Sequence, residues 1–185
     1  NIPLVIYENN LILGRTNKNL LPLSKRLLLG TGMPINFPKK YENKVYKVGN
    51  ILREEIINYS AIKKKNNSKF FSILVLGGSQ GAEIFGEIIP PVIKMLKDKG
   101  HMVEINQQCL GKQKKTLTEY YKKNNIKNNI FDFTNNILDL ISSTDLAISR
   151  SGASTTAELV SMLTPFIAVP YPSSIDNHQH LNAKY

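Results

Sequence analysis

The sequence predicts an α/β fold in which helices cover a parallel β-sheet. After Phe70, short strand-like segments alternate with helical segments along the chain. Runs such as Ile-Leu-Val-Leu at 73–76 are apolar without alternation, which suits strands covered on both faces. Two of the expected strands run directly into turns of small residues, at 77–81 and at 151–154. Together these observations favour a sheet built from βα units.

We expect a strand wherever a short apolar run is bounded by polar or turn residues. The expected strands are Ile2–Tyr7, Arg26–Leu29, Phe71–Leu76, Met102–Ile105, Asn129–Phe133, Leu146–Ile148 and Phe166–Val169. Helices are expected between and after the later strands, at Ala82–Asp98, Lys112–Asn124, Ile137–Ser142, Thr155–Leu163 and His178–Tyr185. Strands that alternate with helices pair in parallel, because each helix returns the chain to the same edge of the sheet.

The composition changes between Met33 and Lys69, where Pro34 and Pro38 interrupt the pattern. The run Lys63–Asn67 is polar, and we interpret it as a solvated loop rather than a binding patch. A domain boundary is therefore expected near 45–53. Because the chain begins with Asn1 instead of Met, we also expect it to be a fragment of a longer protein.

The chain is strongly basic, with 24 Lys and Arg against 14 Asp and Glu, a net charge of +10. Three explanations stay open: compositional drift towards Lys and Asn, attraction to an anionic membrane surface, and nucleic-acid binding. The single cysteine, Cys109, excludes a disulfide framework and a cysteine-based metal site. No apolar run reaches the roughly 18 residues of a membrane-spanning helix.

The segment Asp145–Glu158 has the pattern of an anion-binding turn. A short strand, Leu146–Ile148, leads through Arg150 into the small residues at 151–154, and a helix follows. Small residues let backbone N–H groups approach an anion, and a helix N-terminus adds partial positive charge. Glu158 is placed to accept hydrogen bonds from a ribose diol, although a first-turn acid that complements the helix dipole is an equal alternative.

A second small-residue turn, Gly77–Ala82, follows the strand Phe71–Leu76. Its glycines permit close backbone approach to a ligand, and Ser79 can donate a hydroxyl to phosphate. In an open α/β sheet, ligands bind beyond the carboxyl ends of the strands, where both turns are expected.

A third polar cluster, Asp176–Asn182, follows the stiff turn at Val169–Pro172 and can direct amides at sugar hydroxyls. Its two histidines, His178 and His180, are two residues apart, so they do not share a helix face and a zinc site is disfavoured.

Taken together, these segments resemble the MurG family of glycosyltransferases. The resemblance covers essentially the whole chain with consistent spacing. It rests on Glu8–Asn10 with Leu13-Gly14 and Thr16-Asn17, Gly49-Asn50 with Arg53, Gly77–Ala82, Ser149–Ala153 with Thr155 and Glu158, Pro165 with Val169-Pro170, and His178-Gln179 with Asn182-Ala183.

The resemblance implies a GT-B fold, with two Rossmann-like domains and a cleft between them. Residues 1–46 would end the acceptor domain, and residues 47–185 would form most of the domain that binds UDP-GlcNAc. The implied reaction transfers GlcNAc from UDP-GlcNAc to lipid I (undecaprenyl-pyrophosphoryl-MurNAc-pentapeptide), inverts the anomeric centre and forms lipid II in peptidoglycan synthesis. No cofactor or metal is expected, and the sequence has no Asp-x-Asp pair. The general base is expected upstream of this chain, which alone is expected to be inactive.

The resemblance also assigns site residues. Ser79 matches a phosphate contact, Glu158 the ribose ligand, and Thr134 a backbone segment that reads uracil. Asn10 and Gln179 match sugar contacts. The motifs and the resemblance together assign UDP-GlcNAc binding to Asn10, Arg53, Ser79, Gln80, Gly81, Thr134, Arg150, Ser151, Gly152, Ser154, Thr155, Thr156, Glu158, Leu159 and Gln179.

This chain departs from the family pattern at three positions, because Tyr7, Asn9 and Ile51 stand where the family usually has His, Gln and Pro. Two other functions stay open: another UDP-GlcNAc enzyme of the same fold, such as a 2-epimerase, and a basic module that binds RNA or membrane. The resemblance implies UDP-GlcNAc and lipid I as partners and no nucleic acid. It places the protein peripherally on the cytoplasmic side of the bacterial inner membrane.

Overall fold

The computed structural model describes residues 2–59 and 68–185, without the side chains of Ile175 and of residues 79–82. The predicted solvated run Lys63–Asn67 lies outside the described residues. The chain divides into two compact units. Unit 1 comprises Asn1–Arg53, Ser151–Ala157 and Pro170–Tyr185, and unit 2 comprises Glu54–Arg150 and Glu158–Val169. The domain boundary at residue 46 stays a prediction.

Unit 1 contains a parallel sheet of β1 (Val5–Glu8), β2 (Arg26–Leu29) and β3 (Val45–Lys47), paired in that order. Between these strands lie α1 (Arg15–Leu20) and the 3-10 helix η1 (Lys39–Lys44), and the unit ends with η2 (Ile175–Asn177) and α7 (His178–Lys184). Its core is small and consists of Ile6, Leu21, Leu27 and Leu29.

Unit 2 is built on five parallel strands in the order β6-β5-β4-β7-β8. Their bounds are β4 Phe71–Leu76, β5 Val103–Gln108, β6 Lys127–Phe131, β7 Leu146–Ser149 and β8 Phe166–Ala168. The helices are α2 (Glu54–Tyr59), α3 (Gly78–Asp98), α4 (Gly111–Lys123), α5 (Ile137–Ser142) and α6 (Ala153–Ser161), the last of which starts in unit 1. The predicted α/β fold with a parallel sheet is confirmed.

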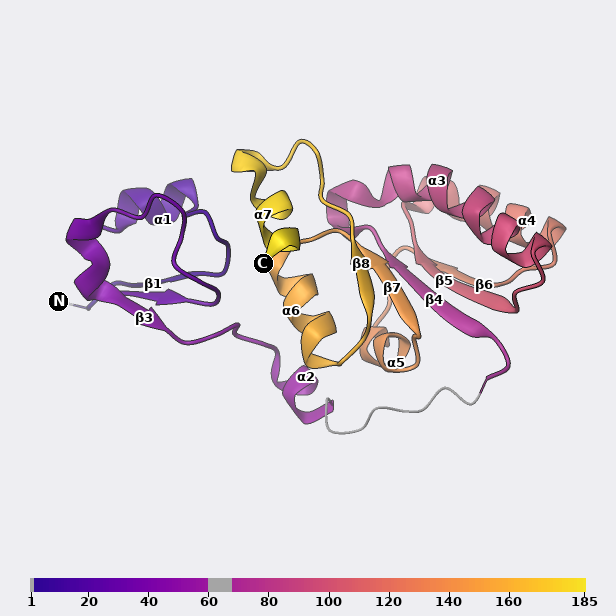
Figure 1. The fold of residues 1–185 in the computed structure, drawn as a ribbon, viewed down its shortest axis with the longest axis horizontal. Coiled ribbons are helices and arrows are strands. Elements are labelled where there is room, and N and C mark those ends of the chain that lie inside the picture. The colour runs from indigo at the N-terminus through magenta and orange to yellow at the C-terminus, as the bar shows by residue number, and fades with distance from the viewer. Residues whose placement is uncertain (1, 60–67) are drawn as a thin grey trace. The chain divides into compact units, whose positions relative to one another are not determined.

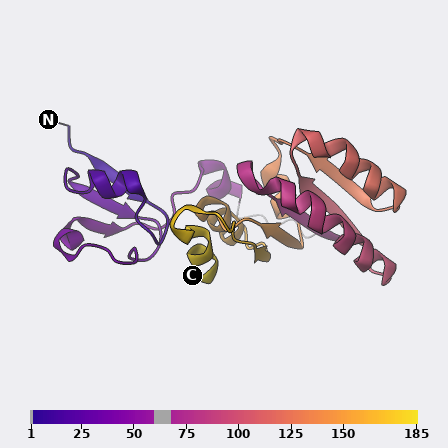
Figure 2. The ribbon, with the colours of Figure 1, turned by 90° about the horizontal axis from the view of Figure 1, so that it is seen from above.

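The main core lies between the sheet and two helices, α3 and α4, which run side by side over one face (Figures 1 and 2). Alternate residues of β4, Ile73 and Val75, point into this core together with Phe85 of α3 and Tyr121 of α4. Both faces of β4 are buried beyond Phe71, which is why its sequence reads as a continuous apolar run. None of the described helices is long and apolar enough to span a membrane.

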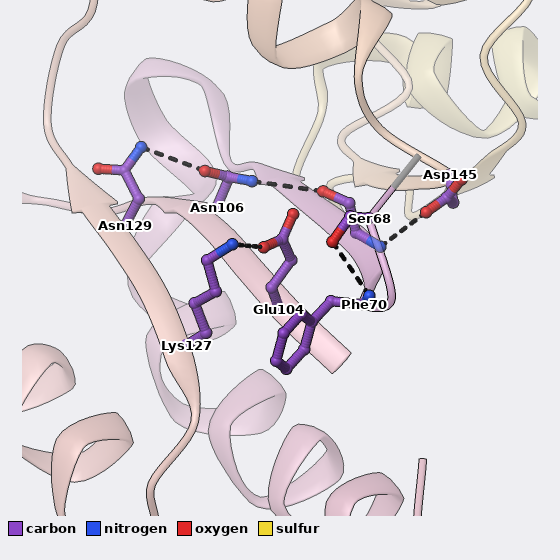
Figure 3. Close-up of polar contacts among 8 residues, drawn as sticks. Ser68, Phe70, Glu104, Asn106, Lys127, Asn129 and Asp145 are labelled. Atoms are coloured by element: carbon purple, nitrogen blue, oxygen red, sulfur yellow. Dashed lines mark hydrogen bonds and ion pairs between the residues drawn. The ribbon is translucent and has the colours of Figure 1, made fainter. Parts of the chain in front are cut away.

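Polar contacts near the amino ends of β4, β5 and β6 fasten these strands to one another (Figure 3). Asn129 Nδ2 donates to Asn106 Oδ1 at 3.1 Å, and Lys127 pairs with Glu104 at 2.5 Å. These cross-strand pairs explain why β6 starts at Lys127 and not at the predicted Asn129, since its polar residues find partners on β5. The amino edge of the sheet is thus occupied by structural contacts.

Several predicted bounds are confirmed, among them those of β2, β4 and α5. The sequence analysis did not predict α1, η1, β3 or α2, because elements of three to six residues are too short to show a period. It also started three helices too late: α3 begins at Gly78 instead of Ala82, α4 at Gly111 instead of Lys112, and α6 at Ala153 instead of Thr155.

Candidate functional site

The strand order of unit 2 creates one point where the chain reverses direction across the sheet. From β4 the chain moves outward to β5 and β6, and it then returns to add β7 and β8 on the other side of β4. Counted from β4, the spatial order is third, second, first, fourth and fifth, as in one half of a dinucleotide-binding fold. Ligands of such sheets bind at this switch point, beyond the carboxyl ends of the two central strands.

The carboxyl ends of β4 and β7 lie side by side at this switch point. Leu76 and Ser149, the last residues of the two strands, are register partners, and the Arg150 N–H donates to the Leu76 carbonyl at 3.2 Å. The two predicted turns therefore leave adjacent strands at the same edge of the sheet, as the sequence indicated.

The turn after β4 is shorter than predicted, because Gly78 is already the first residue of α3. Gly78 has a φ of +65°, a backbone conformation that favours glycine. A Cβ at this position would meet no atom within 4 Å, so space does not restrict the residue type. Ser79, Gln80 and Gly81 lie in the first turn of α3, where backbone N–H groups have no helical acceptor. Their side chains lie outside the described part of the structure.

Arg150 follows β7 directly and is held over the core. Its guanidinium carbon lies 4.8 Å from the centre of the Phe85 ring, and its Nη1 donates to the Val169 carbonyl at 3.4 Å. Phe85 is fully buried on α3, so this stacking connects the strand end to that helix. The guanidinium thus has a fixed position at the switch point.

Helix α6 starts four residues after the end of β7 and carries several of the predicted binding residues. Thr155 and Thr156 lie inside the helix, so the capping role that was the alternative for them does not apply. The Thr156 hydroxyl instead donates to the carbonyls of Gly152 and Ala153, each at 3.0 Å. Ser154 and Glu158 are four residues apart and therefore share one face of α6.

Leu159 is fully buried, so its side chain belongs to the core and only its backbone can contact a ligand. The assignment of Leu159 to UDP-GlcNAc binding stays a prediction, and it is limited to the backbone of this residue.

In unit 1, α7 is tied to the turn that precedes α6. Ser151 is buried, and its hydroxyl donates to the Gln179 carbonyl at 2.7 Å. Asn182 Nδ2 donates to the Ser151 carbonyl and to Asn10 Oδ1, both at 3.1 Å. Gln179 Oε1 accepts the Tyr171 N–H at 2.8 Å, so in this conformation the side-chain oxygen of a predicted sugar contact has a protein partner.

The loop after β1 is organised by Glu8, whose side chain is 4% exposed. Its carboxylate accepts four hydrogen bonds, from the Asn10 N–H, Asn10 Nδ2, the Gly14 N–H and Asn17 Nδ2, at 2.8–3.1 Å. Sequence reasoning missed this role of Glu8. A carboxylate at a strand end followed by Asn-rich residues is the signal that could have revealed it.

Two predicted residues lie outside these contacts. Thr134 follows β6 at the carboxyl edge of the sheet, and its hydroxyl accepts the Asn136 N–H at 3.1 Å. Arg53 is exposed on the segment directly before α2. Within residues 2–59 and 68–185, no three His, Cys, Asp or Glu side chains cluster as metal ligands.

The comparisons with known proteins identify the family of the chain. Residues 72–185 match the family model described as "Glycosyltransferase family 28 C-terminal domain". A protein of Rickettsia canadensis is 37% identical to this chain. The alignment covers the whole of this chain and 52% of the length of that protein. A protein of Pelagibacter ubique is 34% identical to this chain, and the alignment covers the whole chain and 51% of the length of that protein. Both are named UDP-N-acetylglucosamine–N-acetylmuramyl-(pentapeptide) pyrophosphoryl-undecaprenol N-acetylglucosamine transferase. The chain thus spans about half the length of the curated relatives it matches.

Among solved structures, MurG of Acinetobacter baumannii matches the whole chain with a TM-score of 0.72 and 27% identity, over 50% of its own length. UGT2 of Phytolacca americana, solved with UDP-2fluoro-glucose, matches 90% of the chain and 39% of its own length with a TM-score of 0.58 and 17% identity, which shows a shared fold. The predicted GT-B class is confirmed.

Proposed function

The chain belongs to glycosyltransferase family 28, and on that premise we propose that it carries the UDP-GlcNAc-binding part of a transferase that acts on lipid I. The observation that carries the proposal is the pair of small-residue turns on the adjacent strands β4 and β7, at the switch point of the sheet. Relatives with this name transfer N-acetylglucosamine, and a nucleotide diphosphate is the ligand class that such a switch point accommodates.

The diphosphate of the donor would bind at the first turn of α3, which follows β4 at the carboxyl edge of the sheet of unit 2. The N–H groups of a helix's first turn have no acceptor within the helix, and together with the helix dipole they stabilise negative charge. When an acceptor hydroxyl attacks C1 of the sugar, the C1–O bond breaks and charge grows on the departing UDP, so the same groups stabilise the transition state.

Within this proposal the side chains have distinct roles. Glu158 accepts the ribose hydroxyls, Thr134 marks the segment that reads uracil, and Ser79 contacts phosphate. Gln179 and Asn10 bind sugar hydroxyls, after Gln179 exchanges its bond to the Tyr171 N–H for one to the substrate. The reaction inverts the anomeric centre and does not require a metal ion.

We also propose that the protein works peripherally at the cytoplasmic face of the bacterial inner membrane. The reason is chemical: the acceptor in the relatives' names carries undecaprenol, a lipid. The net charge of +10 suits an anionic membrane surface. Co-sedimentation with vesicles that contain anionic lipid, compared with neutral vesicles, tests this placement, and equal binding to both would contradict the electrostatic part.

Calorimetric titration of the purified chain with UDP-GlcNAc tests the donor site. We expect binding, and a loss of about tenfold or more in Glu158→Ala, because two hydrogen bonds to a charged acceptor are removed. Glu119→Ala is the matched control, since Glu119 is an exposed glutamate on α4, far along the chain from both turns. A folded chain that ignores UDP-GlcNAc, or that binds it equally well after Glu158→Ala, refutes this assignment.

A further inference from the structure

Unit 1 continues into unit 2 through residues 48–53, which follow β3 and precede α2. This junction segment is neither helix nor strand. Its start is held by the backbone, because the N–H groups of Val48 and Gly49 both donate to the Leu29 carbonyl, at 3.0 and 3.2 Å. These two contacts continue the pairing of β3 with β2 and fix the junction segment as far as Gly49.

Beyond Gly49 the junction segment is held by a side chain from the opposite edge strand of the sheet. Tyr7 lies on β1, and the strand order β1-β2-β3 puts β2 between β1 and the strand that leads into the junction segment. The Tyr7 hydroxyl nevertheless accepts the Ile51 N–H, at 3.1 Å. The tyrosine side chain thus crosses the end of β2 and ties the junction segment to β1. We call this contact the Tyr7 tether.

The end of β2 has the residue type that this crossing requires. Gly30 directly follows β2 and is buried, and its N–H donates to the Glu8 carbonyl at 2.8 Å. A Cβ on Gly30 would collide with the Tyr7 hydroxyl oxygen. Glycine therefore leaves the space that the tyrosine occupies, and any other side chain would push the hydroxyl away from Ile51.

The Tyr7 tether joins two of the positions at which this chain departs from the family pattern. Tyr7 and Ile51 stand where the family usually has His and Pro. Proline has no N–H and fixes its own φ, so a proline at position 51 would stiffen the junction segment and would offer no donor to a hydroxyl. Ile51 lacks that stiffness but has the N–H, and Tyr7 supplies the acceptor. The two departures therefore compensate each other.

We propose that Tyr7 is a positioning residue for the donor substrate, because its tether fixes the backbone that carries Arg53. The proposal rests on the proposed function, since the resemblance assigns Arg53 to UDP-GlcNAc. Arg53 is exposed and lies two residues after Ile51, so the positions open to it depend on how the Ile51 amide is held. The tether raises the fraction of chains in which Arg53 is placed for binding, and the affinity for UDP-GlcNAc rises by the same factor.

Calorimetric titration with UDP-GlcNAc compares the purified chain with Tyr7→Phe, which removes only the hydroxyl. We expect Tyr7→Phe to bind about fivefold more weakly, since the tether is one neutral hydrogen bond. Hydrogen exchange of the Ile51 amide, measured without ligand, should become faster by a similar factor. Tyr46→Phe is the matched control and should change neither quantity, because Tyr46 is exposed on β3 and its hydroxyl makes no hydrogen bond with the described part of the chain.

Two double-variant comparisons separate positioning from a general loss of stability. In Arg53→Ala, which removes the positioned side chain, adding Tyr7→Phe should leave the UDP-GlcNAc affinity unchanged. In Tyr7→Phe, adding Ile51→Pro should restore most of the lost affinity, because proline stiffens the junction segment and has no N–H to satisfy. In the unsubstituted chain, Ile51→Pro breaks a formed tether and should not raise the affinity. Neither Asn50 nor Ile51 has a positive φ, so a left-handed backbone does not oppose the proline.

Circular dichroism establishes that each variant is folded. The positioning role is overturned if Tyr7→Phe leaves either the exchange of the Ile51 amide or the UDP-GlcNAc affinity unchanged. It is also overturned if Tyr7→Phe weakens binding equally in Arg53→Ala, or if Ile51→Pro has the same effect with Tyr7 and with Phe at position 7. These outcomes leave the proposed function intact, because the unsubstituted chain still binds UDP-GlcNAc. If the unsubstituted chain does not bind it, the proposed function fails, and the positioning role fails with it.

Discussion

Replacing Glu8 by glutamine should loosen the loop that carries Asn10. The Glu8 carboxylate is buried, and each of its oxygens accepts two N–H groups: Oε1 those of Asn10, and Oε2 those of Gly14 and Asn17. Glutamine has nearly the same shape, but one oxygen becomes an NH2 group. Whichever way the amide turns, two donors then face a donor, and two of the four hydrogen bonds are lost.

The expected cost follows from these contacts. Each hydrogen bond to a charged group contributes about 1.5–3 kcal/mol, so two contribute about 3–6 kcal/mol. A neutral amide is cheaper to bury than a carboxylate, which offsets part of this loss. We therefore expect Glu8→Gln to lower the unfolding free energy of unit 1 by about 3 kcal/mol. That loss is large for a unit whose core has only a few buried apolar side chains.

Urea unfolding followed by circular dichroism measures this cost, and hydrogen exchange of the Asn10 and Gly14 amides localises it. Both amides should exchange faster in the variant than in the parent chain. Glu42→Gln is the control, because Glu42 is exposed on η1 and a surface change of this kind shifts stability by no more than about 0.5 kcal/mol. If Glu8→Gln costs no more than the control, the carboxylate does not organise this loop.

Three further predictions concern other contacts. Tyr121→Phe should lower the free energy of unfolding by about 1–3 kcal/mol, because it leaves the buried Gln107 Oε1 without the hydroxyl that donates to it at 2.7 Å. An unchanged midpoint of urea unfolding would contradict this. Burial also raises the pKa of Tyr121, so the folded chain keeps a proton that the unfolded chain loses from about pH 10 upwards. Stability should therefore fall as the pH rises above that value, and Tyr121→Phe should flatten the decline. Burial likewise raises the pKa of the Cys109 thiol, and this residue is 2% exposed. A disulfide reagent should therefore modify the thiol slowly in the folded chain and quickly in urea. Fast modification of the folded chain would show that the thiol is exposed. Gly30→Ala should lower the free energy of unfolding by about 1–3 kcal/mol through overpacking, since its Cβ would collide with the Tyr7 hydroxyl oxygen. Tyr7→Phe should restore part of this loss, and additive effects of the two changes on the melting temperature would argue against the contact.

Much of unit 2 could be predicted from local sequence. The continuous apolar run of β4 and the small residues after β4 and β7 are readable because strand burial and turn conformation depend on adjacent residues. The short elements of unit 1 could not be predicted. Helix α1 has six residues and no side-chain cap, and Asn17 anchors it through hydrogen bonds to the Tyr7 carbonyl and the Glu8 carboxylate.

The candidate site divides in the same way. Glu158 and the small residues at 151–154 were recognisable by type and spacing. The burial of Leu159 and the stacking of Arg150 on Phe85 were not, because each depends on which distant segment packs against the residue.

By itself, the sequence determined the alternation of strands and helices, the two small-residue turns and the family. Apolar periodicity, glycine and helix-start residues act over a few neighbouring positions, so the order of residues alone carries them. Only the tertiary structure decided that β4 and β7 are adjacent strands of the sheet. It also decided that Glu8 holds the Asn10 loop and that the Tyr7 hydroxyl accepts the Ile51 N–H. These features come from hydrogen bonds and packing between residues far apart in the chain, whose pairing is chosen by the free energy of the whole fold.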